Sequence, residues 1–185
     1  MTDTRRLEGF AALIAFGLTI PAANWLIGHA GTVCTPEGPC LIPVAPGVMA
    51  PSGVLMIGLA LVLRDLVQRR LGLGFAWIAI LGGTILSAFL APPSLVLASA
   101  AAFLISETVD LAVYTPLQRR NLVLAVLASG LAGLVVDSIA FLFIAFGDLS
   151  FLSGQVLGKL WMVLLALPLV SWLRRADERR GILPA

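Results

Sequence analysis

The only lysine of the chain, Lys159, lies inside an apolar run, residues 151–172, that is long enough to cross a lipid bilayer. The preceding apolar run, residues 122–146, carries an aspartate, Asp137. A charge near the middle of a membrane helix costs at least a few kcal/mol. Such a residue therefore usually faces the interior of a helix bundle, where it often marks the path of a ligand or an ion. We expect function to lie at this pair.

The two charges are predicted to lie at matching depths. Asp137 lies roughly 13 Å and Lys159 roughly 12 Å from the outer ends of their helices, at 1.5 Å per residue. The short connection, residues 147–150, makes the two helices antiparallel neighbours, so the charges can meet. They could form a structural ion pair or a ligand-binding or proton-linked site. Because buried ion pairs are often poor stabilisers, the second interpretation is favoured.

A second polar stripe lies in the run before these two. Glu107, Asp110 and Tyr114 follow i, i+3, i+7 spacing and therefore share one face of a helix. Two carboxyl groups on one buried stripe repel, and one of them could stay protonated at neutral pH. Alternatively, both reach the cytoplasmic interface and pair with Arg119 or Arg120. The depth of Glu107, roughly 10 Å from the inner helix end, favours a functional role.

Small and polar residues accompany the central pair. Gly133 lies four residues before Asp137, a spacing that lets another helix approach closely. Ser138 adds a hydroxyl group beside the aspartate, and Gln155 lies one turn before Lys159. These side chains are candidate substrate ligands because they combine hydrogen-bond donors and acceptors.

Further candidates lie in the first two helices and beyond Asp137. Asn24 is a polar residue near the outer end of the first apolar run. Asp65 follows Arg64 at the expected inner end of the second, where a solvated interface pair is the favoured interpretation. Trp25 and Phe141 are the aromatic residues that could stack on a planar ligand.

The composition predicts an all-α integral membrane protein that forms a single transmembrane domain over residues 1–185. Hydrophobic residues make up 59% and charged residues 12% of the chain, and the mean hydropathy is +1.03. A membrane helix needs about 20 apolar residues. The sequence contains six such windows, at about residues 9–27, 44–63, 73–91, 93–114, 122–146 and 151–173. The first window is too long for the core of a cleaved signal peptide, so we expect a retained helix.

The arginines predict the orientation. With six spans, every arginine falls on the same side of the membrane, and the positive-inside rule then places both termini in the cytoplasm. An odd number of spans would scatter them over both sides. The eleven arginines are Arg5, Arg6, Arg64, Arg69, Arg70, Arg119, Arg120, Arg174, Arg175, Arg179 and Arg180.

The outer loop and the missing motifs limit the chemistry. Cys34 and Cys40 could form a disulfide in an oxidising compartment or remain two free thiols. His29 stands alone, without metal-ligand spacing around it, so no metal is expected. The chain lacks the GxSxG and HExxH motifs and a phosphate-binding loop. We therefore expect neither an enzyme nor a bound cofactor.

Several segments resemble the VUT family of membrane proteins. Residues 133–146, GLVVDSIAFLFIAF, are similar to its most recognisable stretch, in which Asp-Ser/Thr precedes an aromatic run and Ile-Ala-Phe. Lys159 falls where that family has a lysine in its last helix, and residues 23–26, Ala-Asn-Trp-Leu, resemble its Ser-Asn-Tyr-Leu. Residues 47–72 and 98–120 resemble its second and fourth helices.

The resemblance implies a transporter of the cytoplasmic (inner) membrane that imports a queuosine precursor, preQ0 or preQ1, for salvage into tRNA modification. These are 7-deazaguanine bases, that is, small planar heterocycles. The alternative is the substrate-binding membrane subunit of a multi-component vitamin-like importer. We expect the lipid bilayer and the small molecule as partners, no nucleic acid, and leave a homo-oligomer open. The positions matching the family's motifs are Asn24, Asp65, Asp110, Asp137, Ser138 and Lys159, to which helical geometry adds Glu107, Tyr114 and Gln155. Of these, Asp65 and Tyr114 are predicted to act in coupling or gating, and the others to bind the substrate.

Overall fold

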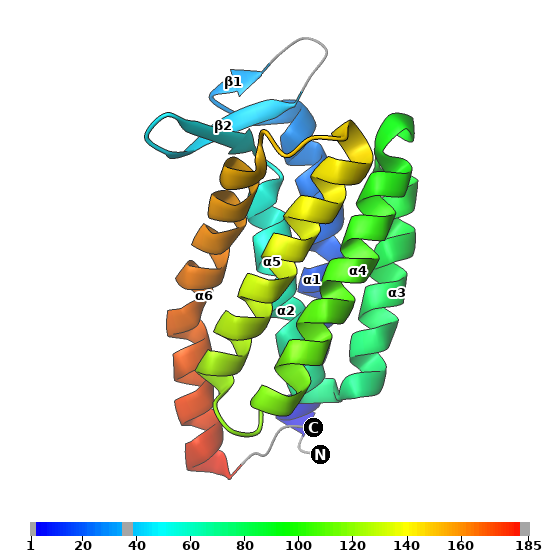
Figure 1. Ribbon diagram of the computed structural model, residues 1–185. Helices are drawn as coiled ribbons and strands as arrows, with labels where there is room; N and C mark the ends of the chain where they lie inside the picture. Colours follow the sequence, from blue (N-terminus) through cyan, green and yellow to red (C-terminus); the bar gives the residue numbers. More distant parts are fainter. Residues whose placement is uncertain (1–2, 35–38, 182–185) are drawn as a thin grey trace.

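The computed structural model describes residues 3–34 and 39–181, and in this part of the chain it contains a bundle of six α-helices with a small sheet at one end (Figure 1). The sheet is antiparallel and its strand order is β1-β2-β3. Helix α1 begins and helix α6 ends at the opposite end of the bundle, here called the inner end. The elements are α1 (Asp3–His29), β1 (Val33–Cys34), β2 (Cys40–Ala45), β3 (Val48–Pro51), α2 (Val54–Leu71), α3 (Leu73–Leu90), the 3-10 turn η1 (Pro93–Leu95), α4 (Val96–Leu117), α5 (Leu122–Phe146) and α6 (Leu152–Arg180).

Local signals in the sequence set the ends of several helices. Helix α5 begins after Asn121, whose side chain accepts a hydrogen bond from the Leu124 backbone N–H. It ends at Gly147, which adopts a left-handed conformation with φ of 70°. Ala91 and Pro92 separate α3 from η1, which begins at Pro93. The two prolines give a tight turn, because proline and the residue before it disfavour helix.

The prediction of a second helix over residues 44–63 is wrong at both ends. Residues 44–51 belong to β2, β3 and the turn between them, where Gly47 has a φ of 72°. Proline and glycine interrupt helical geometry in this segment, so α2 starts only at Val54. It then continues to Leu71, which moves Arg64 from the predicted helix end to about 10 Å inside the helix.

Helix α2 is the central helix of the bundle. It contacts each of the other five helices, and it supplies side chains to the two larger hydrophobic clusters, Leu61 and Val62 to one and Ala60 and Val67 to the other. Its neighbours shield it from lipid. A helix in this position can carry charged residues that a lipid-facing helix could not.

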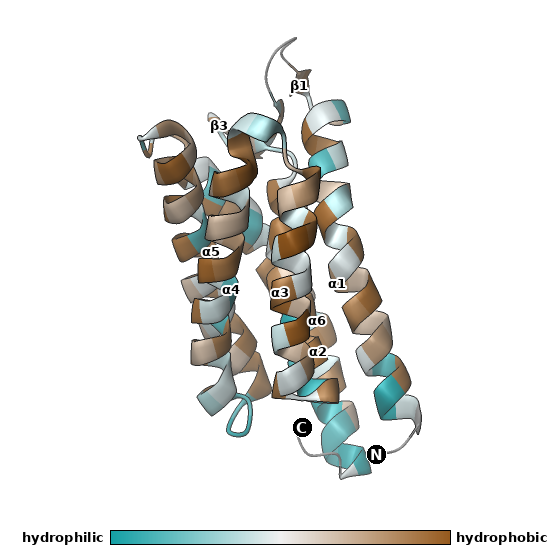
Figure 2. Ribbon diagram, turned by 90° about the vertical axis from the view of Figure 1, so that its right-hand side faces the viewer, coloured by the Kyte–Doolittle hydropathy of each residue, from teal (hydrophilic) through white to brown (hydrophobic). Residues whose placement is uncertain are grey.

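Within the described residues, five helices are long and apolar enough to cross a membrane: α1, α3, α4 with η1, α5 and α6. Helix α2 is not one of them, because its 18 residues include four charged side chains. The outer surface of the bundle is apolar: Phe89, Leu97 and Phe143, for example, are more than half exposed. Figure 2 shows hydrophilic residues gathered at the inner end. This is the surface of a multi-pass membrane protein.

The sheet covers the end of the bundle opposite the inner end, here called the sheet end (Figure 1). Cys34 and Cys40 form a disulfide that joins β1 to β2, which resolves the alternative that the sequence left open. The Trp161 Nε1–H group of α6 donates to the Val44 carbonyl oxygen at 2.8 Å. The sheet is therefore fixed to the last helix as well as to the first two.

Candidate functional site

Lys159 and Asp137 meet, as the sequence predicts. Lys159 Nζ lies 2.6 Å from Asp137 Oδ2, 2.8 Å from Ser138 Oγ and 2.7 Å from Gln155 Oε1. A lysine ammonium group has three N–H donors, so these oxygens use all of them. We call the four residues Asp137, Ser138, Gln155 and Lys159 the Lys159 centre. Its one cation and one anion balance.

Close helix packing holds this centre in place. Helices α5 and α6 are joined by a short turn and supply all four side chains. On α2, Gly58 lies so close to Lys159 that an added Cβ would meet the Lys159 carbonyl oxygen, and it would lie 2.9 Å from the Lys159 Cα. The backbone of α2 can approach only because this residue has no side chain. Three helices therefore fix the depth of Lys159, which is 1% exposed.

Asp137 connects the Lys159 centre to a cavity. Its Oδ1 atom accepts a hydrogen bond of 3.3 Å from Ser106 on α4, and the residue keeps 8% of its surface exposed. The cavity beside it has a volume of about 120 Å³ and is lined by residues of α1, α2, α3, α4, α5 and α6. Lys159 and Gln155 contribute to the same wall. The ion pair is thus both a structural contact and part of a cavity lining.

Two amide side chains and two aromatic rings complete the cavity. Asn24 Nδ2 donates to the Ile20 carbonyl oxygen at 3.0 Å, and the residue lines the cavity. Gln155 uses its Oε1 atom for Lys159, so its amide N–H groups are the donors. Phe103 and Phe141 are the aromatic residues of the lining.

Trp25, which the sequence suggested for stacking, does not line this cavity. It is 58% exposed, and its indole ring stacks on His29 with 5.2 Å between ring centroids. Asn24 and Trp25 are consecutive residues of a helix, so their side chains point in different directions and only Asn24 faces inward.

A larger cavity of about 630 Å³ adjoins the first one on the side of the sheet. Leu41 of β2 and Phe151 at the start of α6 belong to its lining. The two cavities have common walls, so the larger one lies between the cavity at the Lys159 centre and the sheet end. The residues that line both are Ile27, Pro51, Pro92, Leu95, Phe141 and Gln155.

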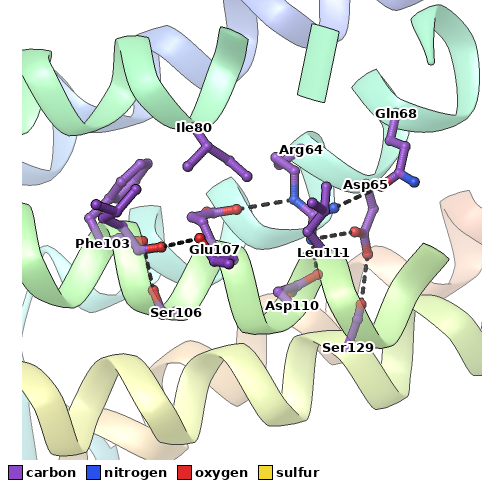
Figure 3. A network of polar contacts seen from close by, with 12 residues as sticks. Arg64, Asp65, Gln68, Ile80, Phe103, Ser106, Glu107, Asp110, Leu111 and Ser129 are labelled. Atoms are coloured by element: carbon purple, nitrogen blue, oxygen red, sulfur yellow. Dashed lines mark hydrogen bonds and ion pairs between the residues drawn. The ribbon is translucent and has the colours of Figure 1, made fainter. Parts of the chain in front are cut away.

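A second buried charged site surrounds Arg64 (Figure 3). Its guanidinium group lies 2.9 Å from Asp65 Oδ1 and 3.1 Å from Glu107 Oε2, and it also pairs with Asp110 Oδ1. Gln68 accepts a further hydrogen bond of 3.1 Å. We call Arg64, Asp65, Gln68, Glu107 and Asp110 the Arg64 cluster. Each of its members is at most 1% exposed.

The Arg64 cluster corrects several interpretations from the sequence. The pair of Arg64 and Asp65 is not solvated at the interface, because α2 continues past it and other helices cover it. Glu107 and Asp110 contact Arg64 rather than Arg119 or Arg120, because α4 faces α2 at this level. All three carboxylates lie outside the cavity lining.

Tyr114 belongs to the surroundings of this cluster and not to the cavity. The Arg64 guanidinium carbon lies 5.7 Å from the centre of its ring, and its hydroxyl group is buried without a hydrogen-bond partner in the described part of the chain. Sequence reasoning missed Arg64 as an interior residue, as well as Gln68. The spacing of Arg64 and Gln68, four residues apart, is the signal that could have suggested a shared helix face.

The inner end carries a third group of charges. Asp177 of α6 pairs with Arg69 at 2.6 Å and with Arg70 at 2.8 Å, and Arg70 also lies 2.8 Å from Glu8 of α1. These contacts join the ends of α1, α2 and α6. Apart from Arg64, the arginines therefore lie at or near one end of the bundle, in the first turns of α1, the last turns of α2 and α6, and the connection between α4 and α5.

The comparison with protein families gives one match. Residues 52–173, about two thirds of the chain, match the family described as "Putative vitamin uptake transporter". No curated protein and no solved structure matches the chain. The matched segment contains α2 to α5 and α6 as far as residue 173, and with them the Lys159 centre and the whole Arg64 cluster. The chain therefore belongs to the vitamin uptake transporter (VUT) family of membrane proteins.

Proposed function

We propose that this protein imports a queuosine precursor, preQ0 or preQ1, across the cytoplasmic (inner) membrane for salvage into tRNA modification. The observation that carries the proposal is the Asp137 carboxylate, which Lys159 holds in the wall of an interior cavity. The family match supports transport of a small molecule, and the motifs in residues 133–146 and at Lys159 favour the 7-deazaguanine class.

The hydrogen-bonding groups of the cavity suit the edge of a guanine-like base. A carboxylate accepts from the ring N–H and the exocyclic amine of such an edge, so Asp137 would take this role. The Gln155 amide N–H would donate to the carbonyl oxygen of the base. Lys159 has already used its three donors, so it positions Asp137 and Gln155 instead of contacting the base.

The size and the apolar walls of the cavity fit one bicyclic ligand. A cavity needs a volume of roughly 10–15 Å³ to hold one buried water molecule. The cavity volume of about 120 Å³ therefore holds about ten groups of the size of a water molecule. Phe103 and Phe141 provide the faces that would cover a planar ring. The larger cavity on the sheet side would be the route by which the base arrives.

In the proposed orientation, both termini lie in the cytoplasm and six helices cross the membrane. These are the five long apolar helices together with α2. The arginines at the inner end support it through the positive-inside rule. The disulfide at the sheet end supports it as well, because disulfides persist in oxidising compartments outside the cytoplasm.

Uptake of radiolabelled preQ1 in cells that cannot synthesise queuosine precursors tests the proposal. Cells with the wild-type chain should accumulate label, and the Asp137→Asn and Lys159→Met variants should not, at equal membrane expression. Asp148→Asn and Arg179→Met remove exposed charges of the same types and should transport normally. Normal uptake by the first two variants would refute the proposed site, and no uptake by any form would refute the substrate.

Reconstitution distinguishes a complete transporter from the binding subunit of a larger importer. The purified chain alone in lipid vesicles should take up labelled preQ0. Uptake that appears only after addition of a co-purifying ATPase would assign the chain to the second class.

A further inference from the structure

The Arg64 cluster is a buried charged site that the proposed binding of a base does not use. It lies beside the cavity, on the side of the inner end, and shares none of its lining. We propose that the Arg64 cluster is a proton-binding site that couples proton movement to transport. The proposal rests on the proposed transport function, and it adds the energy source.

The first argument is the balance of charge. One guanidinium group faces three carboxyl groups, those of Asp65, Glu107 and Asp110, and all four are buried. If all were ionised, the cluster would carry a net charge of −2 between apolar helices. Uncompensated charge of this kind is strongly disfavoured in a membrane interior. Like-charged carboxylates that share a site are therefore relieved by binding a proton.

The second argument is the position of two unpartnered atoms. Within residues 3–34 and 39–181, Asp110 Oδ2 is buried and accepts no hydrogen bond, and Asp65 Oδ1 has only the ion pair with Arg64 and no aligned donor. Asp65 Oδ1 and Asp110 Oδ1 both pair with the same nitrogen atom, Arg64 Nη2, so the two carboxyl groups lie side by side. Two carboxylates cannot bond without a proton between them, because an ionised carboxylate has no donor. A proton shared by Asp65 and Asp110 satisfies both.

The surroundings favour a proton over a metal cation. Arg64 already occupies the space among the three carboxylates, so a further cation would meet its positive charge. In the described part of the chain, no group of acidic, histidine and cysteine side chains could hold a metal ion. Outside the cluster, the charged or titratable groups near it are Tyr114 from α4, with Arg69 of α2 beyond its ring, and Asp137 from α5. The Ser129 hydroxyl group of α5 donates to Asp65 Oδ2 at 3.0 Å.

The third argument is the connection to the substrate site. Ser106 and Glu107 are adjacent on α4; Ser106 donates to Asp137 in the Lys159 centre, while Glu107 binds Arg64. A movement of α4 therefore changes both sites together. Gly133 on α5 allows the same helix to pack closely, since an added Cβ would lie 3.0 Å from Asp110 Oδ2. Binding of a base at Asp137 and binding of a proton at the Arg64 cluster are linked through this helix.

Infrared spectroscopy of the purified protein tests proton binding without any substrate. We expect the C=O stretch of a protonated carboxylic acid at neutral pH. It should disappear in Asp65→Asn and in Asp110→Asn, because each change lowers the negative charge of the cluster, and persist in Asp137→Asn. Absence of the band in the wild type, or its persistence in both cluster variants, would overturn the proposal. Gel filtration and thermal unfolding check that the near-isosteric variants fold, and Glu107→Gln provides a third variant of the same cluster.

Reconstituted vesicles test the coupling. With the membrane potential clamped, a gradient of about one pH unit should sustain roughly tenfold accumulation of labelled preQ0 if one proton moves with each base. Asp65→Asn should keep the exchange of labelled for unlabelled preQ0 but lose this accumulation. The proposal would be overturned, and the proposed function left intact, if wild-type accumulation of preQ0 did not depend on the pH gradient or depended on a sodium gradient instead. If preQ0 is neither bound nor exchanged, the proposed function fails, and the infrared measurement still decides whether the cluster binds a proton.

Discussion

The Lys159 centre and the Arg64 cluster are both buried charged sites, but they differ in charge balance and in access. Lys159 faces one carboxylate, which borders a cavity. Arg64 faces three carboxylates, and neither Arg64 nor these carboxylates line that cavity. A balanced site with one accessible carboxylate suits an exchangeable ligand of molecular size. A sealed site with excess negative charge suits a proton, which needs no cavity.

Removal of the cation from the Arg64 cluster should have the largest effect on stability. Arg64→Met leaves three buried carboxyl groups without a counter-charge, and breaking even one buried pair costs about 3–5 kcal/mol. We expect the free energy of unfolding to fall by at least this amount, with little protein in the membrane. The yield and the Tm of the protein in detergent measure it.

Neutralising the partners provides the control for this variant. Arg64→Met combined with Asp65→Asn, Asp110→Asn and Glu107→Gln removes the charges together and should recover much of the lost stability. If Arg64→Met alone has the Tm of the wild type, the carboxyl groups do not depend on the guanidinium group, and the contrast between the two sites fails.

A double-mutant cycle at the Lys159 centre should show a smaller effect on stability and a complete effect on uptake. Asp137→Asn or Lys159→Met alone leaves one buried charge unpaired, which should cost about 3 kcal/mol. The double variant should be closer to the wild type in Tm, because no charge remains. All three should fail to accumulate preQ1. A stable double variant that transports would make the pair purely structural.

The sequence predicted the Lys159 centre well because its geometry is local. Asp137 and Lys159 lie on consecutive helices with a short turn, so helix rise alone places them at one depth. The glycine at position 133 indicated close packing on the correct face, where the structure finds Asp110 and Leu61.

The Arg64 cluster could not be predicted in the same way because it depends on tertiary packing. Hydropathy joined residues 44–51 to the second helix, although prolines and a positive-φ glycine make them a hairpin. This error placed Arg64 at a helix end. The burial of α2 by five other helices leaves no periodic signal in its own sequence, and the cavity likewise combines residues from six helices.

The contact between α2 and α6 allows a milder substitution that affects only the Lys159 centre. In Gly58→Ala the new methyl group meets the Lys159 backbone, which cannot rotate away as a side chain could. Overpacking of this kind costs about 1–3 kcal/mol. We expect a lower Tm and weaker uptake of preQ1 with normal pH-gradient dependence. Gly17→Ala is the matched control, since its Cβ would have nothing within 4 Å. Equal Tm values for the two variants would show that α2 and α6 are less closely packed than described.

The smallest expected effect distinguishes the two aromatic residues that the sequence suggested for stacking on the base. Phe141 lines both cavities, whereas Trp25 is 58% exposed and stacks on His29. Aromatic stacking contributes about 1 kcal/mol beyond burial, so Phe141→Ala should raise the KM for preQ1 uptake about fivefold. Trp25→Ala should leave KM unchanged, although it removes the larger ring. The reverse result would place the base outside the cavity, near the end of α1, and would remove the reason for treating the Lys159 centre as its binding site.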